Sequence, residues 1–253
     1  MNKISQWIKT YSEENKIKTL VVGVSGGVDS AVISTLCVLT GLDVLVVNMP
    51  IYQNKTLDSL SDQHISWLVQ NYKNVQSKKI DLTSCFDSFS GVFTEKDKDE
   101  LSLANSRARL RMTTLYQLAA TNSGIVVGTG NKVEDFGVGF FTKYGDGGVD
   151  ISPIANLMKT EVWELAKSLG ISDEIIEAAP TDGLWNDGRT DEDQLGAPYS
   201  EIEKAMIYSE ENSLTEYTPT TDEKFNTTLK TYWYHRSKNL HKMIPIPVYY
   251  EEK

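Results

Sequence analysis

Residues 19–30 read TLVVGVSGGVDS, an apolar strand-like run followed by a Gly/Ser turn and the start of an apolar helix. Glycines in such a turn let the main chain approach an anion, and the NH groups at a helix N-terminus attract negative charge. We therefore predict a phosphate-binding loop over Gly23, Val24, Ser25, Gly26, Gly27, Val28, Asp29 and Ser30. The alternative is a plain strand-to-helix turn in which Asp29 and Ser30 cap the helix.

Asp29 is the unusual residue of this loop, because a carboxylate repels a phosphate unless a divalent cation lies between them. Oxygen ligands suit Mg²⁺, so Asp29 is a candidate magnesium ligand. The loop lacks the lysine of the GxxxxGK[ST] motif, and its glycines do not fit the GxGxxG spacing of dinucleotide-binding folds.

Strand-like and helix-like segments alternate along the chain, which predicts an α/β fold with a parallel sheet. Buried strands are expected at 19–24, 43–49, 75–82 and 124–128, and helices at 29–40, 55–72, 99–122, 158–169 and 222–243. This order favours a doubly wound parallel sheet with flanking helices. Such sheets bind ligands beyond the carboxyl ends of their strands.

The 253 residues are predicted to form a single domain. We expect an N-terminal helix within 1–18, a nucleotide-binding α/β core over 19–182, a mobile loop over 183–197, and C-terminal helices with a tail over 198–253. The glycine-rich, aromatic stretch 135–150 is typical of a loop that encloses a ligand.

The composition excludes several classes of protein. The formal charge is 25 − 35 = −10, which opposes nucleic acid and anionic membranes as partners. Cys37 and Cys85 cannot form a disulfide framework, and no apolar run is long enough to span a membrane, so we expect a cytoplasmic protein. Three histidines without an HExxH pair make a zinc hydrolase an unfavourable hypothesis.

The predicted helix over 99–122 is apolar on two faces. The stripe Leu101, Ala104, Ala108, Met112, Leu115 and Ala119 is expected to face the sheet, while Leu103 and Leu110 lie opposite. A subunit interface or a helix of the same chain would cover that second face. Arg109 is expected to reach a site at the sheet edge, and Arg107 and Arg111 to be surface or interface cations.

The SGGxDS loop resembles the pyrophosphate loop of the ATP pyrophosphatases, which include tRNA-thiolating enzymes and NAD synthetases. Further segments are similar to NAD synthetases in the same order, namely 105–112 (NSRARLRM), 127–134 (VGTGNKVE), 139–150 (GFFTKYGDGGVD), 179–181 (APT) and 241–242 (HK). The resemblance covers about residues 20 to 245 and implies an adenine nucleotide alpha-hydrolase-like fold.

The resemblance implies ATP-dependent amidation of deamido-NAD (nicotinate adenine dinucleotide) to NAD by ammonia, through an adenylated carboxylate, with release of AMP and pyrophosphate. It adds Thr129, Lys159 and Thr181 to the loop as ATP contacts. It implies Mg²⁺ held by Asp29 and Glu134, with Asp135 as the alternative second ligand. It also implies a homodimer.

For deamido-NAD, the resemblance points to Arg109, Lys143, Asp150, His241 and Lys242. Asp146 and Lys159 are the expected catalytic residues. Asp146 would bind ammonium or accept a proton from the attacking amine, because a nucleophilic ammonia must be neutral. An aspartate that merely forms the turn is the alternative for Asp146.

Two other classes of protein are alternatives for a chain with this loop. A tRNA-thiolating adenylase would require paired cysteines and a basic face, which the sequence lacks. A nucleotide-binding sensor without turnover would have little need of a metal ligand at Asp29. Because the chain begins about 20 residues before its first strand, it has no room for a preceding glutaminase domain, and we expect free ammonia as the nitrogen source.

Overall fold

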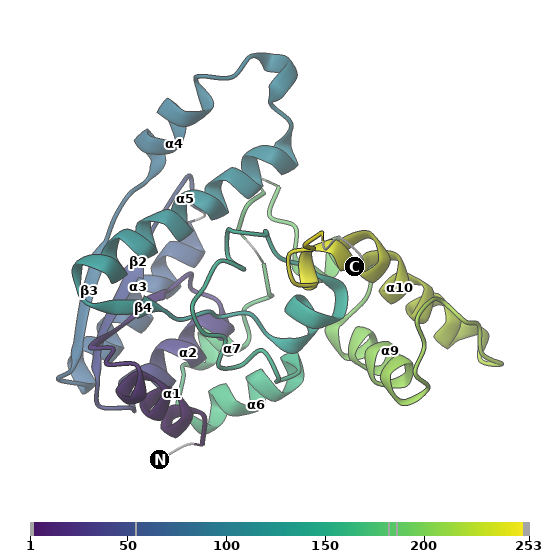
Figure 1. Ribbon diagram of the computed structural model, residues 1–253, viewed down its shortest axis with the longest axis horizontal. Coiled ribbons are helices and arrows are strands. Elements are labelled where there is room, and N and C mark those ends of the chain that lie inside the picture. The colour runs from purple at the N-terminus through teal and green to yellow at the C-terminus, as the bar shows by residue number, and fades with distance from the viewer. Residues whose placement is uncertain (1–2, 54, 182, 186, 250–253) are drawn as a thin grey trace.

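The computed structural model describes residues 3–53, 55–181, 183–185 and 187–249. Its centre is a four-stranded parallel sheet in the order β3-β2-β1-β4 (Figure 1). The strands are β1 (Thr19–Gly23), β2 (Asp43–Asn48), β3 (Val75–Lys79) and β4 (Gly124–Val126). The predicted parallel sheet is confirmed, with all four strands at the expected positions.

The predicted helices are confirmed as α2 (Val28–Val38), α3 (Lys55–Asn71), α5 (Glu100–Thr121), α6 (Lys159–Ser168) and α10 (Glu223–Met243). The other helical elements are α1 (Lys3–Glu14), α4 (Thr83–Ser90), η1 (Glu95–Asp97), the π-type turn η2 (Val133–Val138), α7 (Asp173–Ile176), α8 (Asp191–Leu195) and α9 (Tyr199–Glu211). Gly170, two residues beyond α6, has a left-handed φ of 72°.

Helices cover both faces of the sheet, as a doubly wound fold requires. Alternate strand residues point to opposite faces. Leu20 and Val22 belong to the hydrophobic cluster that includes residues of α1, α2, α3, α6 and α7, whereas Val21 belongs to the cluster with residues of α4 and α5. Each face therefore has its own hydrophobic core.

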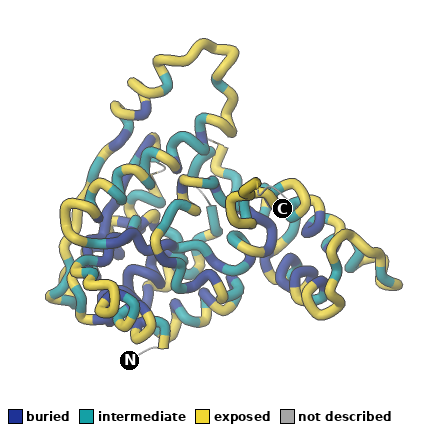
Figure 2. The backbone as a smooth tube through the Cα atoms, in the orientation of Figure 1, coloured by how far each residue is buried: buried dark blue, intermediate teal, exposed yellow. Residues whose placement is uncertain are grey.

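A third hydrophobic cluster lies outside the sheet, between η2, α9 and α10. It includes Val138, Tyr199, Ile202, Met206 and Tyr232, and it appears as a second buried patch in Figure 2. The C-terminal helices are thus packed by a core of their own.

β3 differs from the prediction that every strand is buried. It is the outer strand of the sheet, paired with β2, and four of its five residues are exposed. The reason is its composition, because Gln76, Ser77, Lys78 and Lys79 carry no apolar side chain toward either helical layer.

The second apolar face of α5 is covered by the chain itself. Leu103 and Leu110 pack against the cluster that contains Phe86 of α4. Leu101, expected to face the sheet, is instead 56% exposed, because it lies in the first turn of α5, ahead of the residues that pack on the strands.

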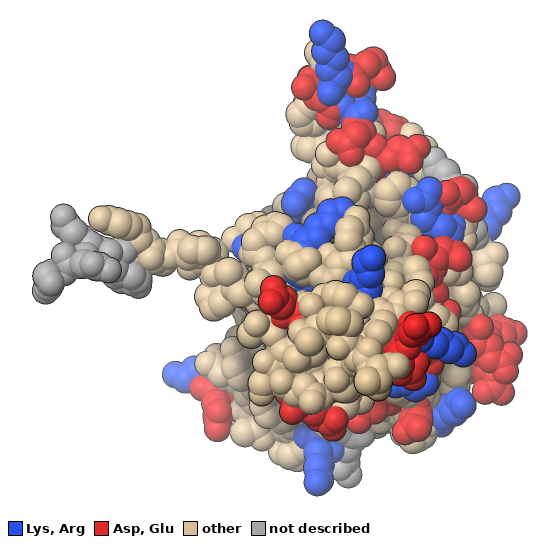
Figure 3. Space-filling view, turned by 90° about the vertical axis from the view of Figure 1, so that its right-hand side faces the viewer, with Lys and Arg blue, Asp and Glu red and all other residues tan. Residues whose placement is uncertain are grey.

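Acidic and basic side chains are interspersed on the face that carries the C-terminal helices, with several Lys and Arg side chains near its middle (Figure 3). None of the helices within the described ranges is long and apolar enough to cross a membrane.

Four of the predicted segments include positions outside the described residues: 1–2 in the N-terminal segment, 54 and 182 in the predicted core, 186 in the predicted mobile loop, and 250–253 in the tail. Within that loop, the Asp191 NH donates to the carbonyl of Pro180 at 2.8 Å and the Thr181 hydroxyl to the carbonyl of Arg189 at 3.1 Å.

Candidate active site

The loop between β1 and α2 has the close main-chain approach expected of a phosphate-binding turn. Gly26 has a φ of 93°, and a Cβ there would lie 2.4 Å from the carbonyl oxygen of Leu57. Ser30 braces the turn, since its hydroxyl donates to the Gly27 carbonyl at 2.9 Å and accepts the Ser25 NH at 3.1 Å. Asp29 is the second residue of α2, and its carboxylate accepts from the side chains of Asn131 and Lys159.

A cavity of about 600 Å³ opens at the carboxyl ends of β1, β2 and β4. This volume is in the range of pockets that hold small-molecule ligands. Of the predicted ATP, metal and substrate residues, its lining includes Gly23, Val24, Ser25, Gly27, Val28, Asp29, Ser30, Thr129, Glu134, Asp146, Lys159, Thr181 and Lys242. The structure thus brings together predicted ATP contacts from four separate segments, and of these contacts Gly26 is not in the lining.

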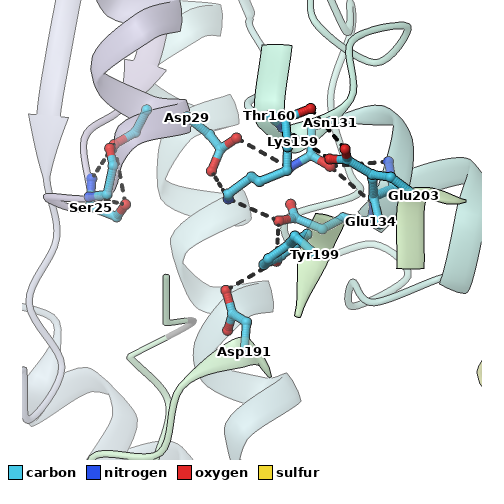
Figure 4. A network of polar contacts seen from close by, with 12 residues as sticks. Ser25, Asp29, Asn131, Glu134, Lys159, Thr160, Asp191, Tyr199 and Glu203 are labelled. Carbon is cyan, nitrogen blue, oxygen red and sulfur yellow. Dashed lines mark hydrogen bonds and ion pairs between the residues drawn. The ribbon is translucent and has the colours of Figure 1, made fainter. Parts of the chain in front are cut away.

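Lys159 lies between two carboxylates at the base of this cavity (Figure 4). Its ammonium is 2.5 Å from Asp29 Oδ2 and 3.2 Å from Glu134 Oε1, and the side chain is 2% exposed. Burial alone would lower the pKa of Lys159, but the two carboxylates raise it by more, so the pKa lies above its ordinary value. Lys159 is therefore a buried cation held by two carboxylates.

These carboxylates fit a magnesium ion. Asp29 and Glu134 converge on one point, the Lys159 ammonium, from α2 and η2. Within the described chain no cluster of three or more His, Cys, Asp or Glu side chains is placed to hold a metal, and Mg²⁺ commonly binds one or two carboxylates together with substrate phosphates and water.

Asp135 is placed differently from Glu134. Its carboxylate lies against Gly130, and it is not among the residues that line the cavity. Burial, followed by the charges of Glu134, Asp146 and Asp29, raises the pKa of Asp135 to about 7. The geometry therefore favours Glu134 as the second metal ligand.

Asn131 links the two candidate metal ligands, a role that the sequence did not reveal. Its Nδ2 donates to Asp29 Oδ1 at 3.2 Å, while its Oδ1 accepts the NH groups of Val133 at 3.1 Å and Glu134 at 3.2 Å. An Asn just before a helical turn is a recognisable capping signal. The contact of Asn131 with Asp29 cannot be recognised in the sequence, because the two residues are 102 positions apart.

Tyr199 also belongs to this cluster, and no sequence signal marked it. Its hydroxyl donates to Glu134 Oε1 at 2.7 Å and lies 3.4 Å from Asp191 Oδ2. The Lys159 ammonium lies 5.0 Å from the centre of its ring.

Four of the predicted deamido-NAD residues lie together. The guanidinium of Arg109 donates to the Lys143 carbonyl at 3.3 Å, and the Lys143 ammonium donates to the His241 carbonyl at 3.2 Å. Lys242 lines the cavity and donates to the carbonyl of Phe141 at 2.7 Å. The contacts join α5, the glycine-rich loop and the end of α10.

Asp150 lies apart from this group. Its carboxylate accepts the Val126 NH at 2.7 Å and the Tyr116 hydroxyl at 3.2 Å, at the outer edge of β4. It is not among the residues that line the cavity. Its role toward a ribose hydroxyl stays a prediction.

Arg107 and Arg111, which were predicted to be surface or interface cations, lie on the inner face of α5. Arg111 lines the cavity and donates to the Met49 carbonyl and to Gln53 Oε1, both at 3.0 Å. Arg107 donates to the carbonyl of Leu184 and lies over the ring of Phe86. Arg107 and Arg111 share one helix face, which is the inner one, and Arg109 is therefore exposed.

Asp146 closes a turn and also lines the cavity. Its Oδ1 accepts the Thr142 NH at 2.9 Å, which closes the glycine-rich turn, and its side chain opens into the cavity. Loss of water around the carboxyl raises the pKa of Asp146 to about 6, although the Thr142 hydrogen bond opposes this shift. Near pH 7 this carboxyl is mostly ionised and can accept a proton.

Comparison with known proteins identifies relatives of the whole chain. The family described as NAD synthase has a model that matches residues 1–245. An NH(3)-dependent NAD(+) synthetase of Carboxydothermus hydrogenoformans is 39% identical over 212 residues, covering 82% of this chain and 84% of its own. Two solved structures are similar. NMN synthetase from Francisella tularensis has a TM-score of 0.81 and 31% sequence identity, and the match covers 97% of this chain and 95% of that one. NH3-dependent NAD synthetase from Campylobacter jejuni has a TM-score of 0.76 and 28% sequence identity, and the match covers 98% of this chain and 96% of that one.

Proposed function

Because the chain belongs to the NAD synthase family, we propose that its cavity joins ATP, deamido-NAD and ammonia to make NAD. The chain is an ammonia-dependent NAD synthetase, a carbon–nitrogen ligase that uses ATP as a substrate. The observation that carries the finer proposal is the phosphate-binding loop opening beside the Asp29–Lys159–Glu134 cluster in one cavity.

The loop amides and Lys159 hold the pyrophosphate end of ATP and leave the α-phosphorus open to attack. A carboxylate oxygen of deamido-NAD forms a bond to that phosphorus, and the bond to the bridging oxygen breaks with release of pyrophosphate. Ammonia then attacks the activated carbonyl carbon, loses a proton, and AMP leaves with the former carboxylate oxygen.

Asp29 and Glu134 would hold Mg²⁺, which when bound neutralises phosphate charge. Asn131 keeps the Asp29 carboxylate turned toward Glu134. Asp146 accepts the proton that ammonium must lose before it can act as a nucleophile. The same carboxyl holds the turn that encloses the site.

The nicotinate dinucleotide is the substrate that the basic group of Arg109, Lys143, His241 and Lys242 suits, because its phosphates are negative. Three of these residues lie beside the cavity and one within its lining. A homodimer would bring a second subunit to the exposed Arg109 side of α5 and complete the site there.

The test is an assay of the purified protein with ATP, Mg²⁺, ammonium and deamido-NAD, with detection of NAD and AMP. We expect one NAD and one AMP per turnover, and almost no product from glutamine in ammonia-free buffer. Because one similar structure is an NMN synthetase, nicotinate mononucleotide is offered in a parallel assay. A higher kcat/KM for the mononucleotide, or equal rates with glutamine, would overturn the proposal.

A further inference from the structure

We call η2, α9 and α10, which share one hydrophobic cluster, the C-terminal lobe. The first two turns of its helix α9 contribute two side chains near the site. Tyr199 and Glu203 are four residues apart on this helix and so lie on one face of it. Both side chains are buried, and Figure 4 shows Tyr199 turned toward Glu134 and Glu203 turned toward Thr160. Other residues of α9, among them Ile202, Ala205 and Met206, form its apolar core contacts.

Tyr199 fixes the orientation of Glu134. The Tyr199 hydroxyl and the Lys159 ammonium both donate to the same oxygen, Glu134 Oε1, at 2.7 and 3.2 Å. Among the described residues no donor reaches Glu134 Oε2, and Glu134 lines the cavity. One oxygen of the carboxylate is thus tied to the protein, and the other is available to a ligand.

The tyrosine keeps the proton that it donates. The ordinary pKa of a tyrosine hydroxyl is about 10, so the group is protonated at neutral pH. A hydrogen bond to an ionised acceptor is stronger than one between neutral groups. The hydroxyl is therefore a fixed donor at neutral pH.

Glu203 fixes the helix that carries Lys159. Its two carboxylate oxygens accept the Thr160 NH at 2.9 Å and the Thr160 hydroxyl at 2.8 Å. Lys159 is the first residue of α6 and Thr160 the second. The free NH groups at a helix N-terminus need acceptors, and a negative charge there is favourable. Glu203 thus supplies from α9 an anchor for the start of α6.

We propose that Tyr199 and Glu203 are positioning residues of the active site, which orient Glu134 and Lys159 toward the nucleotide and its metal. This inference rests on the proposed function, and it assigns the C-terminal lobe a part in assembling the site. Neither residue is proposed to touch substrate.

The first experiment removes the Tyr199 hydroxyl and keeps its ring. Tyr199→Phe is compared with Tyr232→Phe, which removes a buried hydroxyl from the same hydrophobic cluster, where it faces Arg236. Mn²⁺ binding is measured by electron paramagnetic resonance, with a non-hydrolysable ATP analogue present. We expect roughly tenfold weaker Mn²⁺ binding for Tyr199→Phe, as loss of a charge-assisted hydrogen bond predicts, and less than a twofold change for Tyr232→Phe.

The second experiment compares Glu203→Ala with Glu203→Gln. The amide oxygen of Gln can still accept the Thr160 NH, so it should restore most of the anchoring. We expect Glu203→Ala to weaken binding of the ATP analogue roughly tenfold by calorimetry, and Glu203→Gln to lie within about twofold of wild type.

The results separate this inference from the proposed function. Mn²⁺ binding by Tyr199→Phe equal to that of wild type, or an equal loss in Tyr232→Phe, would overturn the role of Tyr199. ATP-analogue binding that is unchanged in Glu203→Ala, or lost equally in Glu203→Gln, would overturn that of Glu203. A wild-type protein that binds Mn²⁺ and the analogue but makes no NAD rejects the proposed function, while the binding comparisons still decide the positioning roles.

Discussion

The ammonium of Lys159 lies 2.5 Å from the carboxylate of Asp29, in a position where the lysine side chain is 2% exposed. Its second partner, Glu134, is the other candidate ligand for Mg²⁺. A divalent cation held by the same two carboxylates would repel that ammonium strongly at such short range. Lysine and metal therefore compete for the space between Asp29 and Glu134 unless phosphates draw the lysine away.

Lys159→Met is expected to separate the competition between lysine and metal from the contribution of lysine to phosphate binding. Without the ammonium, Mn²⁺ should bind the nucleotide-free protein more tightly, because the two carboxylates lose their internal counter-ion. NAD synthesis should fall by about 100-fold, since the phosphates lose a cation. Lys204→Met, which removes an exposed lysine paired with Glu201, serves as the control. Nucleotide-free Mn²⁺ binding that is the same in both variants would contradict the competition.

Asp29→Asn is expected to lower Mg²⁺-dependent turnover by about 100-fold or more, because a neutral amide is a weak ligand for a hard cation. Glu134→Gln should show the same loss with a higher Mg²⁺ requirement. Asp135→Asn provides the matched comparison, because its carboxyl lies against Gly130 and outside the cavity lining. Magnesium titrations of the three variants check the assignment, and a larger loss for Asp135→Asn than for Glu134→Gln would reverse it.

Gly26→Ala is expected to disrupt the phosphate-binding loop. Its φ is 93°, and the new Cβ would lie 2.4 Å from a backbone oxygen of Leu57. We expect a loss of about 2 kcal/mol or more in unfolding free energy, together with loss of ATP binding. Gly41→Ala has a similar φ of 78°, and no atom of the described residues lies within 4 Å of the added methyl group. It should therefore cost only about 1 kcal/mol and leave ATP binding intact. Unfolding free energy is measured by urea unfolding and ATP binding by calorimetry. Equal losses in the two variants would show that contact with Leu57 is unimportant.

His64 is expected to make stability depend on pH. Burial between α2 and α3 lowers its pKa to about 4, from an ordinary value of 6.5. Because the folded-state pKa is depressed, the unfolded chain takes up the proton first, so stability is full above pH 6.5 and falls between pH 6.5 and 4. The loss amounts to about 3 kcal/mol at most.

His64→Phe isolates this contribution. The ring can still stack on Trp67, and Ser34 keeps its bond to the Ser30 carbonyl. Urea unfolding at pH 7.5 and 4.5 should show a stability difference between wild type and variant that changes by about 2–3 kcal/mol. Parallel pH profiles would contradict a buried neutral histidine.

Much of the fold could be predicted from local sequence. Apolar runs bounded by turn residues identified all four strands, and residues 19–30 identified the loop where the cavity opens. The prediction that β3 is buried was wrong, because its five residues form a strand by pairing with β2 rather than by burying apolar side chains. Strand formation there depends on partners 31 residues away in the sequence, such as Val44 for Val75.

The sequence of the loop itself predicted Asp29, whereas Glu134 and Lys159 were predicted from the resemblance to NAD synthetases. The residues that α9 contributes were not predicted. Tyr199 and Glu203 look like ordinary helix residues, and only the packing of α9 brings them to Glu134 and Thr160. The arginine error has a similar origin, because helical spacing shows which residues share a face but not which face turns inward.

The two outer edges of the sheet are protected in different ways. Along β4, Asp150 takes the Val126 NH and Ile151 pairs with Val127, so the main chain there is already engaged. Along β3, the exposed Lys78 and Lys79 place positive charge on the strand. Unsatisfied strand edges recruit strands from other molecules, and charged edge residues oppose this. Both edges of the sheet therefore oppose pairing with strands of other molecules, which would otherwise lead to fibrils when the protein is concentrated.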